Sequence, residues 1–309
     1  MTTILLTHPA SLDHHAGYGH PERPERIQAI ERTLEEERFA LLARETAPLV
    51  SREALLRVHT EPYLAAIESA APQEGLRRLD ADTAMSPGTL EAARRAAGAA
   101  TRAVDAVMSG RCANAFVAMR PPGHHAETET PMGFCFFNNA AIAARHARAI
   151  HGAERVAVVD FDVHHGNGTQ HIFWGDKDAM YCSTHEMPLF PGTGAINERG
   201  EHDQIVNAPL RAGDGGAAFR EAFDIALLPR LEGFRPDLVI VSAGFDAHRL
   251  DPLGHLNLVE ADFAWATRRL MDIAGRACKG RIVSLLEGGY DLDGLARSVA
   301  AHVGALMEG

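Results

Sequence analysis

Short aliphatic runs alternate with longer amphipathic segments along this chain, and that alternation constrains the fold more than any other feature. Five runs are almost continuously apolar, at residues 115–119, 156–159, 180–182, 238–241 and 282–286. A strand that is apolar on both faces belongs in a parallel sheet covered by helices on each side. Helical periodicity fills the intervals, at residues 26–38, 62–70, 89–108, 139–151, 217–231, 261–278 and 294–307. The pattern predicts an α/β doubly wound protein with a mostly parallel central sheet flanked by helices.

Composition and charge narrow the class of protein. No repeat, low-complexity tract or linker divides the chain, so a single domain over residues 1–309 is predicted. The formal net charge of -11 argues against nucleic acid or an anionic membrane as a partner. No run approaches the ~18 apolar residues that span a bilayer, and the N-terminal segment does not have the pattern of a signal peptide, so we expect a cytoplasmic protein. The arginine-rich cation set suggests a bacterial source, and both a monomer and a homo-oligomer are compatible with the sequence.

Polar motifs directly follow each of the five aliphatic runs. In chain order they are RPPGHH, DFDVHHGNG, STH, SAGFD and EGGYD. Open parallel sheets bind ligands in the crevice beyond the carboxyl ends of their strands. We therefore expect motifs that lie far apart in the sequence to converge on one site.

The motif DFDVHHGNG contains candidate metal ligands. If the segment is extended, residues two apart point the same way, so Asp162 and His164 can reach one ion while Asp160 lies on the same face. Asp246, in SAGFD, is the candidate third ligand. Two carboxylates and one imidazole with an open position for water are typical of a catalytic site. Zn²⁺ fits this set, and Fe²⁺ or Co²⁺ would also fit. The four cysteines form no CxxC pair, so no disulfide framework or thiolate zinc site is predicted.

Two further motifs supply groups for amide hydrolysis. His124 and His125 are adjacent imidazoles that can take a proton from water and give one to a departing amine. Asp160 is expected to orient one of them and Asn167 the other. Tyr290 follows a glycine pair at a strand end, where its hydroxyl could hydrogen-bond a developing oxyanion. A solvated histidine loop and a buried structural tyrosine are the alternatives. Because no GxSxG or phosphate-binding glycine motif is present, a metal-activated water is the expected nucleophile.

Taken in order, the motifs HPERPER, RPPGHHAE, GFCFFNN, DFDVHHGNGTQ, FPGTG, SAGFDAHRLDPLG and EGGYD resemble those of the histone deacetylase superfamily. The similarity is greatest to its class II-like and bacterial amidohydrolase members, and it covers nearly the whole chain from His20 onward. The resemblance implies the arginase/deacetylase fold, a single Zn²⁺ on Asp162, His164 and Asp246, and an amide carbonyl polarised by Tyr290.

The same resemblance implies a substrate tunnel. Phe134 and Phe190 match its aromatic walls, and Gly133 matches its floor. Arg26 matches an arginine near an internal acetate exit channel. Asp82 is the candidate for a rim carboxylate that binds the substrate backbone.

Two more assignments come from the resemblance alone. His124 would pair with Asp160, and His125 with Asn167, where class I relatives have aspartate and class II-like members usually have asparagine. A structural K⁺ would bind the side chains of Asp160 and Ser183. Backbone carbonyls would complete this K⁺ site, from Asp162, His164 and Thr184.

The expected function is Zn²⁺-dependent hydrolysis of an acyl amide, with an acylated lysine, a polyamine or a small amide as substrate. Leu253 bears on this choice, because relatives that prefer acetylpolyamines have glutamate at this rim position and acyl-lysine relatives have leucine. The alternatives are an acetylpolyamine amidohydrolase, a ureohydrolase with two Mn²⁺ ions, and a catalytically silent acyl-lysine binding module. The ureohydrolase needs bridging aspartates where this chain has His125, Asn167 and Tyr290, whereas a silent module would have lost a metal ligand or the tyrosine.

Overall fold

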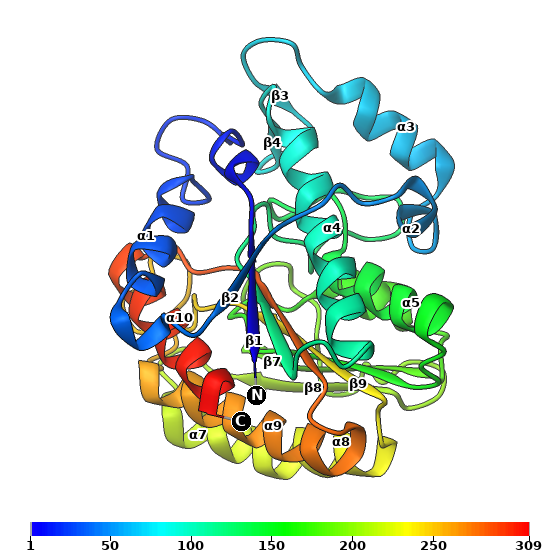
Figure 1. The fold of residues 1–309 in the computed structure, drawn as a ribbon, viewed down its shortest axis with the longest axis vertical. Helices are drawn as coiled ribbons and strands as arrows, with labels where there is room; N and C mark the ends of the chain where they lie inside the picture. Colours follow the sequence, from blue (N-terminus) through cyan, green and yellow to red (C-terminus); the bar gives the residue numbers. More distant parts are fainter. Residues whose placement is uncertain (1, 309) are drawn as a thin grey trace.

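A computed structural model describes residues 2–308, and its centre is an eight-stranded sheet in the order β2-β1-β5-β10-β9-β6-β7-β8 (Figure 1). Every pairing in this sheet is parallel. The strands are β1 (Thr3–Thr7), β2 (Ala43–Thr46), β5 (Asn114–Val117), β6 (Val156–Asp160), β7 (Ala179–Glu186), β8 (Ile205–Leu210), β9 (Leu238–Ala243) and β10 (Ile282–Leu286). A separate antiparallel ribbon joins β3 (Arg77–Arg78) and β4 (Ala84–Met85). The predicted α/β class with a mostly parallel sheet is confirmed.

Helices cover both faces of the sheet. On one face lie α2 (Arg52–Leu56), α3 (Glu61–Ala70), α4 (Thr89–Met108) and α5 (Asn139–His151); on the other lie α1 (Glu25–Leu34), α7 (Gly216–Ala222), α8 (Leu228–Phe234), α9 (Glu260–Cys278) and α10 (Leu292–Glu308) (Figure 1). The strand residues divide between two hydrophobic cores: Val156 and Val158 pack under α4 and α5, whereas Ala157 and Val159 face α9 and α10. This double burial explains why the strands are apolar at every position.

Some elements differ from the prediction. The sequence pattern does not predict β1, β2 or β8. The aliphatic run of β1 is only three residues long, β2 is a half-exposed edge strand, and β8 is interrupted by Asn207 and Pro209. The helix expected over residues 26–38 ends at Leu34 and is followed by a short 3-10 turn, η2 (Glu37–Phe39). The helix expected over residues 217–231 is α7 and α8 joined by a π-helical turn, η3 (Phe223–Leu227). Another 3-10 turn, η1 (Pro9–Leu12), precedes α1. Within residues 2–308, no helix is both long enough and apolar enough to cross a membrane.

The central strands position the polar motifs. The strands β5, β10, β9 and β6 are neighbours, and each is followed at its carboxyl end by one of the motifs. Asp160, the last residue of β6, lies in register with Ser183 of β7 on one side and Ser242 of β9 on the other. The parallel sheet therefore brings the five motifs to one edge, although STH forms part of β7 rather than following it, because β7 continues to Glu186.

Candidate active site

The segment after β6 turns sharply instead of continuing as a strand. Asp160 Oδ1 accepts a hydrogen bond from the backbone N–H of Asp162 at 3.1 Å, and Asp162 Oδ1 accepts one from the N–H of His164 at 2.9 Å. Such contacts between a carboxylate and the N–H two residues later are typical of Asx turns. The expected extended conformation is therefore wrong, but the turns still place Asp162 and His164 side by side.

Asp162, His164 and Asp246 form a buried group in which one ligand atom from each lies within 4.8 Å of the others. His164 Nδ1 lies 3.2 Å from Asp162 Oδ1 and 3.1 Å from Asp246 Oδ2. The backbone approaches just as closely: Gly288 N–H donates to Asp162 Oδ2 at 2.8 Å, and a methyl group at Gly288 would lie 2.1 Å from Asp246 Oδ2. The glycine is therefore required for the backbone to orient the carboxylates.

The charge of this group shows that it fits a cation. Burial disfavours a charged imidazole, but hydrogen bonds from His164 to Asp162 and Asp246 outweigh it and raise the pKa of His164 to about 10. Without an ion, the two buried carboxylates thus hold a proton on the imidazole to balance their charge. A bound divalent ion would supply that positive charge directly, and the three side chains can hold one.

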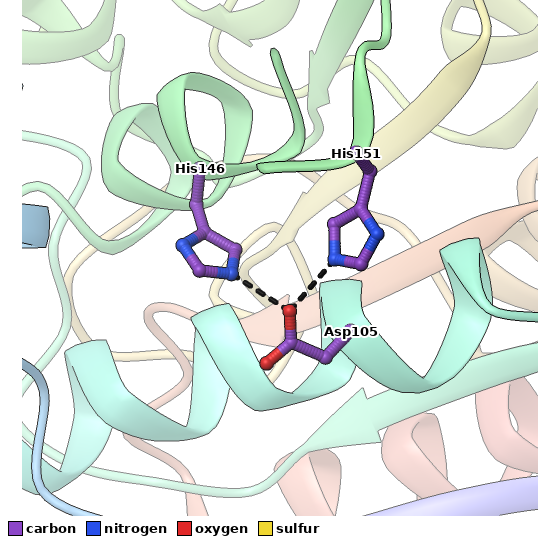
Figure 2. A group of neighbouring side chains, drawn as sticks. All are labelled: Asp105, His146 and His151. Atoms are coloured by element: carbon purple, nitrogen blue, oxygen red, sulfur yellow. Dashed lines mark hydrogen bonds and ion pairs between the residues drawn. The ribbon is translucent and has the colours of Figure 1, made fainter. Parts of the chain in front are cut away.

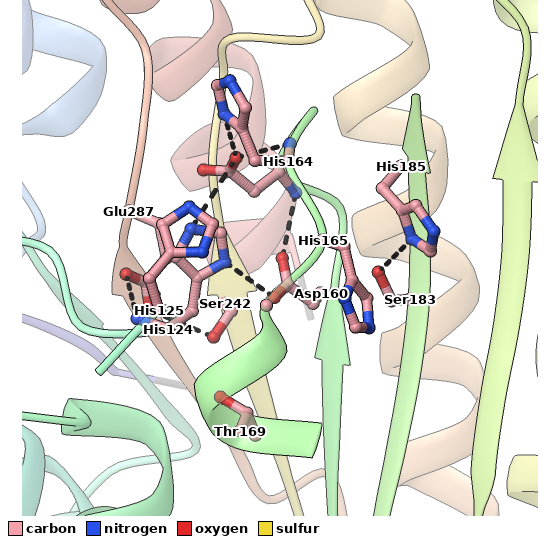
Figure 3. A network of polar contacts seen from close by, with 12 residues as sticks. His124, His125, Asp160, His164, His165, Thr169, Ser183, His185, Ser242 and Glu287 are labelled. Atoms are coloured by element: carbon pink, nitrogen blue, oxygen red, sulfur yellow. Dashed lines mark hydrogen bonds and ion pairs between the residues drawn. The ribbon is translucent and has the colours of Figure 1, made fainter. Parts of the chain in front are cut away.

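His124 and His125 lie beside this group, with their ring centroids 4.0 Å apart (Figure 3). His124 Nδ1 is 2.9 Å from Asp160 Oδ2, and His125 Nδ1 is 2.8 Å from Asn167 Oδ1. Asn167 Nδ2 donates to Glu127 Oε1 at 2.9 Å, which turns the amide oxygen toward His125. Because that oxygen can only accept, His125 carries its proton on Nδ1 and leaves the lone pair of Nε2 free.

The two imidazoles have opposite electrostatic environments. Burial disfavours the charged form of His124, but the charges of Asp162 and Asp160 outweigh it and raise its pKa to about 10. Burial and the neighbouring positive charges of His124 and His164 hold the pKa of His125 well below its usual value. One histidine is therefore cationic and the other neutral at pH 7.

Two residues that the sequence analysis did not identify support this pair. Tyr181 donates its hydroxyl to Asp160 Oδ2 at 3.0 Å. Glu287, at the start of EGGYD, accepts from the backbone N–H of Gly123 at 2.7 Å and from Ser242 Oγ at 3.1 Å. Burial raises the pKa of Glu287 to about 7. Glu287 follows β10 directly, so its position at a strand end was the available signal.

Tyr290 is held through both its backbone and its ring. Its N–H donates to Asp251 Oδ2 at 2.7 Å, a partner that the sequence analysis did not identify. The guanidinium carbon of Arg26 lies 4.9 Å from the ring centroid, and Arg26 Nε donates to the carbonyl of Gly289 at 2.6 Å. Burial raises the pKa of Tyr290 well above its usual value although Arg26 opposes this. The hydroxyl therefore keeps its proton and can donate it in a hydrogen bond.

A cavity of about 260 Å³ leads to these groups. Phe134, Phe190 and Tyr290 supply its aromatic surface, and the ring of Phe190 lies 5.1 Å from that of His125. Gly133 has a φ of +56°, and a methyl group there would lie 2.4 Å from Cδ2 of His125, so only glycine fits. The remaining lining residues are Asp82, His164, Leu189 and Leu253. All the residues expected to form the tunnel thus surround one cavity, and their roles stay predictions.

The residues expected at the K⁺ site lie behind the histidine pair. Ser183 Oγ is 2.8 Å from His185 Nδ1, and the hydroxyl of Thr184 is buried without a hydrogen-bond partner in the described part of the chain. Asp160 of β6 lies in register with Ser183 on the adjacent strand β7. The structure therefore places Asp160 and Ser183 side by side, and the K⁺ site stays a prediction.

Comparison with known proteins shows to which family the chain belongs. The model of the histone deacetylase domain matches residues 20–306. The chain belongs to the histone deacetylase family. It is 42% identical over 280 residues to a histone deacetylase-like amidohydrolase of Pseudomonas aeruginosa, covering 89% of this chain and 73% of the relative. It is 38% identical over 318 residues to a probable deacetylase of Archaeoglobus fulgidus, covering 100% of this chain and 87% of the relative.

A solved structure shows the same fold. The crystal structure of the HD domain of HDA15 matches with a TM-score of 0.94 at 36% identity, covering 99% of this chain and 88% of the other. Membership of this deacetylase and amidohydrolase family supports an enzyme, and the buried cluster of Asp162, His164 and Asp246 is where it could hold a metal ion.

Proposed function

We propose that this histone deacetylase-family protein is a Zn²⁺-dependent deacetylase or amidohydrolase that cleaves the C–N bond of a linear acyl amide. One observation carries the proposal: two adjacent imidazoles, each held by its own hydrogen-bond partner, lie beside the buried cluster of carboxylates and His164, and Tyr290 lines the same cavity. Zn²⁺ would be held by Asp162, His164 and Asp246, a ligand set that also suits Fe²⁺ or Co²⁺. When bound, the ion polarises the amide carbonyl and lowers the pKa of water from ~15.7 to about 7.

The proton transfers fall to His125. Its free Nε2 takes a proton from the attacking water as the new C–O bond forms, and then gives it to the amine nitrogen as the C–N bond breaks. His124, whose cationic form Asp162 and Asp160 favour, stabilises negative charge in the site. Tyr290 donates its hydroxyl hydrogen to the carbonyl oxygen as that oxygen becomes negative. The products are a carboxylate and an ammonium group, whose nitrogen has received both protons of the water.

The shape and charge of the tunnel favour an acyl-lysine over an acetylpolyamine. Phe134 and Phe190 enclose a narrow apolar passage suited to a methylene chain, and Leu253 at the rim offers no charge for a second ammonium. Asp82 also lines this cavity, and in the proposed function its carboxylate accepts hydrogen bonds from a peptide backbone. A structural K⁺ on Asp160 and Ser183, behind the histidine pair, would stabilise the buried carboxylate.

The test measures acetate release from acetyl-lysine peptides by the metal-free chain and after addition of Zn²⁺, Fe²⁺ or Co²⁺, alongside acetylspermidine and longer acyl chains. Tyr290→Phe should bind the same amount of metal and lower kcat about 10²-fold or more. Asp246→Ala should lose the metal itself. Turnover that persists in the metal-free chain, or in Tyr290→Phe, would contradict the proposed chemistry. Peptide binding without any acetate release would favour the silent module instead.

A further inference from the structure

A second group of metal-ligating side chains lies where α4 packs against α5, away from the active-site cavity (Figure 2). His146 Nε2 is 2.8 Å from Asp105 Oδ1, and His151 Nε2 is 2.7 Å from the same oxygen. The two histidines stand in the last turns of α5, and the carboxylate projects from α4. Both imidazoles thus direct the same ring nitrogen at one carboxylate oxygen.

We propose that Asp105, His146 and His151 form a binding site for a transition-metal dication such as Zn²⁺ or Co²⁺, separate from the deacetylase centre. Two imidazole nitrogens and one carboxylate oxygen are the ligands that these borderline ions prefer, and water would complete the coordination. This site does not depend on the proposed deacetylase function.

The geometry allows the ion to enter. Metal–ligand distances of ~2.0–2.2 Å require ligand atoms somewhat further apart than a hydrogen bond, so the carboxylate must retreat by a few tenths of an ångström. The side chain of Asp105 is 38% exposed, against 13% for His146 and 21% for His151, so the carboxylate has room to move. An open hollow of about 830 Å³ that Gly152 lines is also lined by Arg145 and Arg148 and by none of the three ligands, so the ion would reach the group from the exposed side of Asp105.

The carboxylate is ionised and ready to bind. Burial by itself would raise the pKa of Asp105, but hydrogen bonds from His151 and His146 outweigh that effect and lower it. An anionic Asp105 between two imidazoles provides the negative charge that a dication requires.

Arg57 opposes metal binding in a way that can be tested. Its Nη1 lies 3.2 Å from His146 Nδ1, and because a guanidinium can only donate, that nitrogen must accept. The imidazole proton of His146 therefore sits on Nε2, which faces Asp105. Coordination through Nε2 requires the proton to move to Nδ1 and Arg57 to turn away. Glu53, 2.7 Å from Arg57 Nη2, offers the arginine another partner.

The experiment counts metal equivalents on the full chain by equilibrium dialysis against Co²⁺ or Zn²⁺ with elemental analysis. Asp105→Asn and His151→Gln should each bind one equivalent fewer than the wild type and keep the wild-type turnover of acetyl-lysine peptide. His171→Gln is the matched control, because His171 is an exposed histidine of α6 (Asn167–Phe173) outside the group. This variant should bind as many metal equivalents as the wild type. Counting the difference between variants isolates this site whatever the deacetylase centre binds.

Arg57→Gln provides the second arm. A glutamine oxygen can accept from Nδ1–H of a metal-bound His146, so this variant should bind the additional Co²⁺ about tenfold more tightly than the wild type. The visible spectrum of that Co²⁺ should indicate four or five ligands and be absent in His151→Gln, which checks the assignment if Asp105→Asn folds poorly. Equal numbers of equivalents in the wild type and His151→Gln at millimolar Co²⁺ would overturn the site. Unchanged or weaker binding in Arg57→Gln would overturn the role given to the arginine.

Discussion

Two neighbouring histidines in this protein differ in charge state, and the partners of their Nδ1 atoms contribute to that difference. Asp160 brings a negative charge to Nδ1 of His124, whereas Asn167 brings only an amide oxygen to Nδ1 of His125. In the proposed mechanism only the neutral member can start as a base. An asparagine rather than an aspartate at residue 167 is thus one of the features, with burial and the nearby charges of His124 and His164, that keep His125 neutral.

Asn167→Asp should raise the pKa of His125, because a carboxylate favours the imidazolium where an amide does not. In the proposed mechanism His125 must be protonated when the amine departs. With a raised pKa it stays protonated to higher pH, so the basic limb of the kcat profile should move to higher pH. The acidic limb should move the same way, since the free base forms later. Profiles of wild type and variant on one acetyl-lysine peptide test this, and superimposable limbs would show that His125 does not control them.

Asp251 is a positioning residue for Tyr290. Its carboxylate accepts from the N–H groups of Tyr290 at 2.7 Å and of Leu253 at 3.0 Å, so it links the tyrosine to the rim. Asp251→Ala should lower kcat roughly tenfold, because misplacing the oxyanion donor weakens only the transition-state contact.

A double-mutant cycle separates this role from a general loss of stability. If Asp251 acts through the tyrosine, its substitution should cost much less kcat in the Tyr290→Phe background than in the wild type. Fully additive losses would assign Asp251 a role unrelated to Tyr290.

At the scale of elements, α4 packs so closely against the backbone of residues 48–50 that it requires a glycine at this contact. A methyl group at Gly98 would lie 2.0 Å from the carbonyl oxygen of Pro48 and 2.7 Å from the backbone nitrogen of Val50. Alanine is favoured over glycine by ~1 kcal/mol in a helix interior, but these contacts are with backbone that cannot easily move. Packing therefore outweighs helix propensity at this position.

Gly98→Ala should lower the free energy of unfolding by about 1–3 kcal/mol, as overpacking usually does. Gly304→Ala in α10 is the control, because nothing lies within 4 Å of the added methyl group, and it should be neutral or stabilising by up to ~1 kcal/mol. Chemical denaturation of both variants gives the comparison. A stabilising Gly98→Ala would show that α4 does not pack this closely on residues 48–50.

At the scale of the whole molecule, a net charge of -11 attracts any cationic substrate from a distance, whereas the rim acts only on a bound one. Salt screens the first effect strongly and a short-range ion pair less so. Preference between a peptide and a polyamine should therefore depend on the rim residue Leu253 rather than on the overall charge.

Leu253→Glu should raise kcat/KM for acetylspermidine relative to an acetyl-lysine peptide by about tenfold, which corresponds to ~1.4 kcal/mol of differential binding. The ratio of the two kcat/KM values, measured at low and at physiological salt, isolates the local contribution. If the wild type already prefers acetylspermidine at both salt concentrations, the leucine does not set the preference.

The sequence alone determined the architecture and the candidate ligands, because both depend on local patterns of residues. Strands buried on both faces need continuous apolar runs, and a parallel sheet puts the segments that follow them at one edge. The predicted bounds of β10, α4 and α5 agree with the structure, because the apolar run of the strand and the helical periodicity of the two helices end where the elements end. Edge strands such as β2 carry no such signal, since one side of them meets solvent.

Tertiary structure decided which distant groups meet. Asp162 and His164 became neighbours through Asx turns rather than an extended strand. The backbone N–H of Tyr290 donates to Asp251, which lies 39 residues earlier in the sequence. Asp105 contacts His146, 41 residues later, where two helices pack together. Hydrophobic periodicity reports how deeply a face is buried, but it contains no information on which polar side chains approach each other when two such faces pack. Those contacts depend on the packing of whole elements, and only the folded molecule defines them.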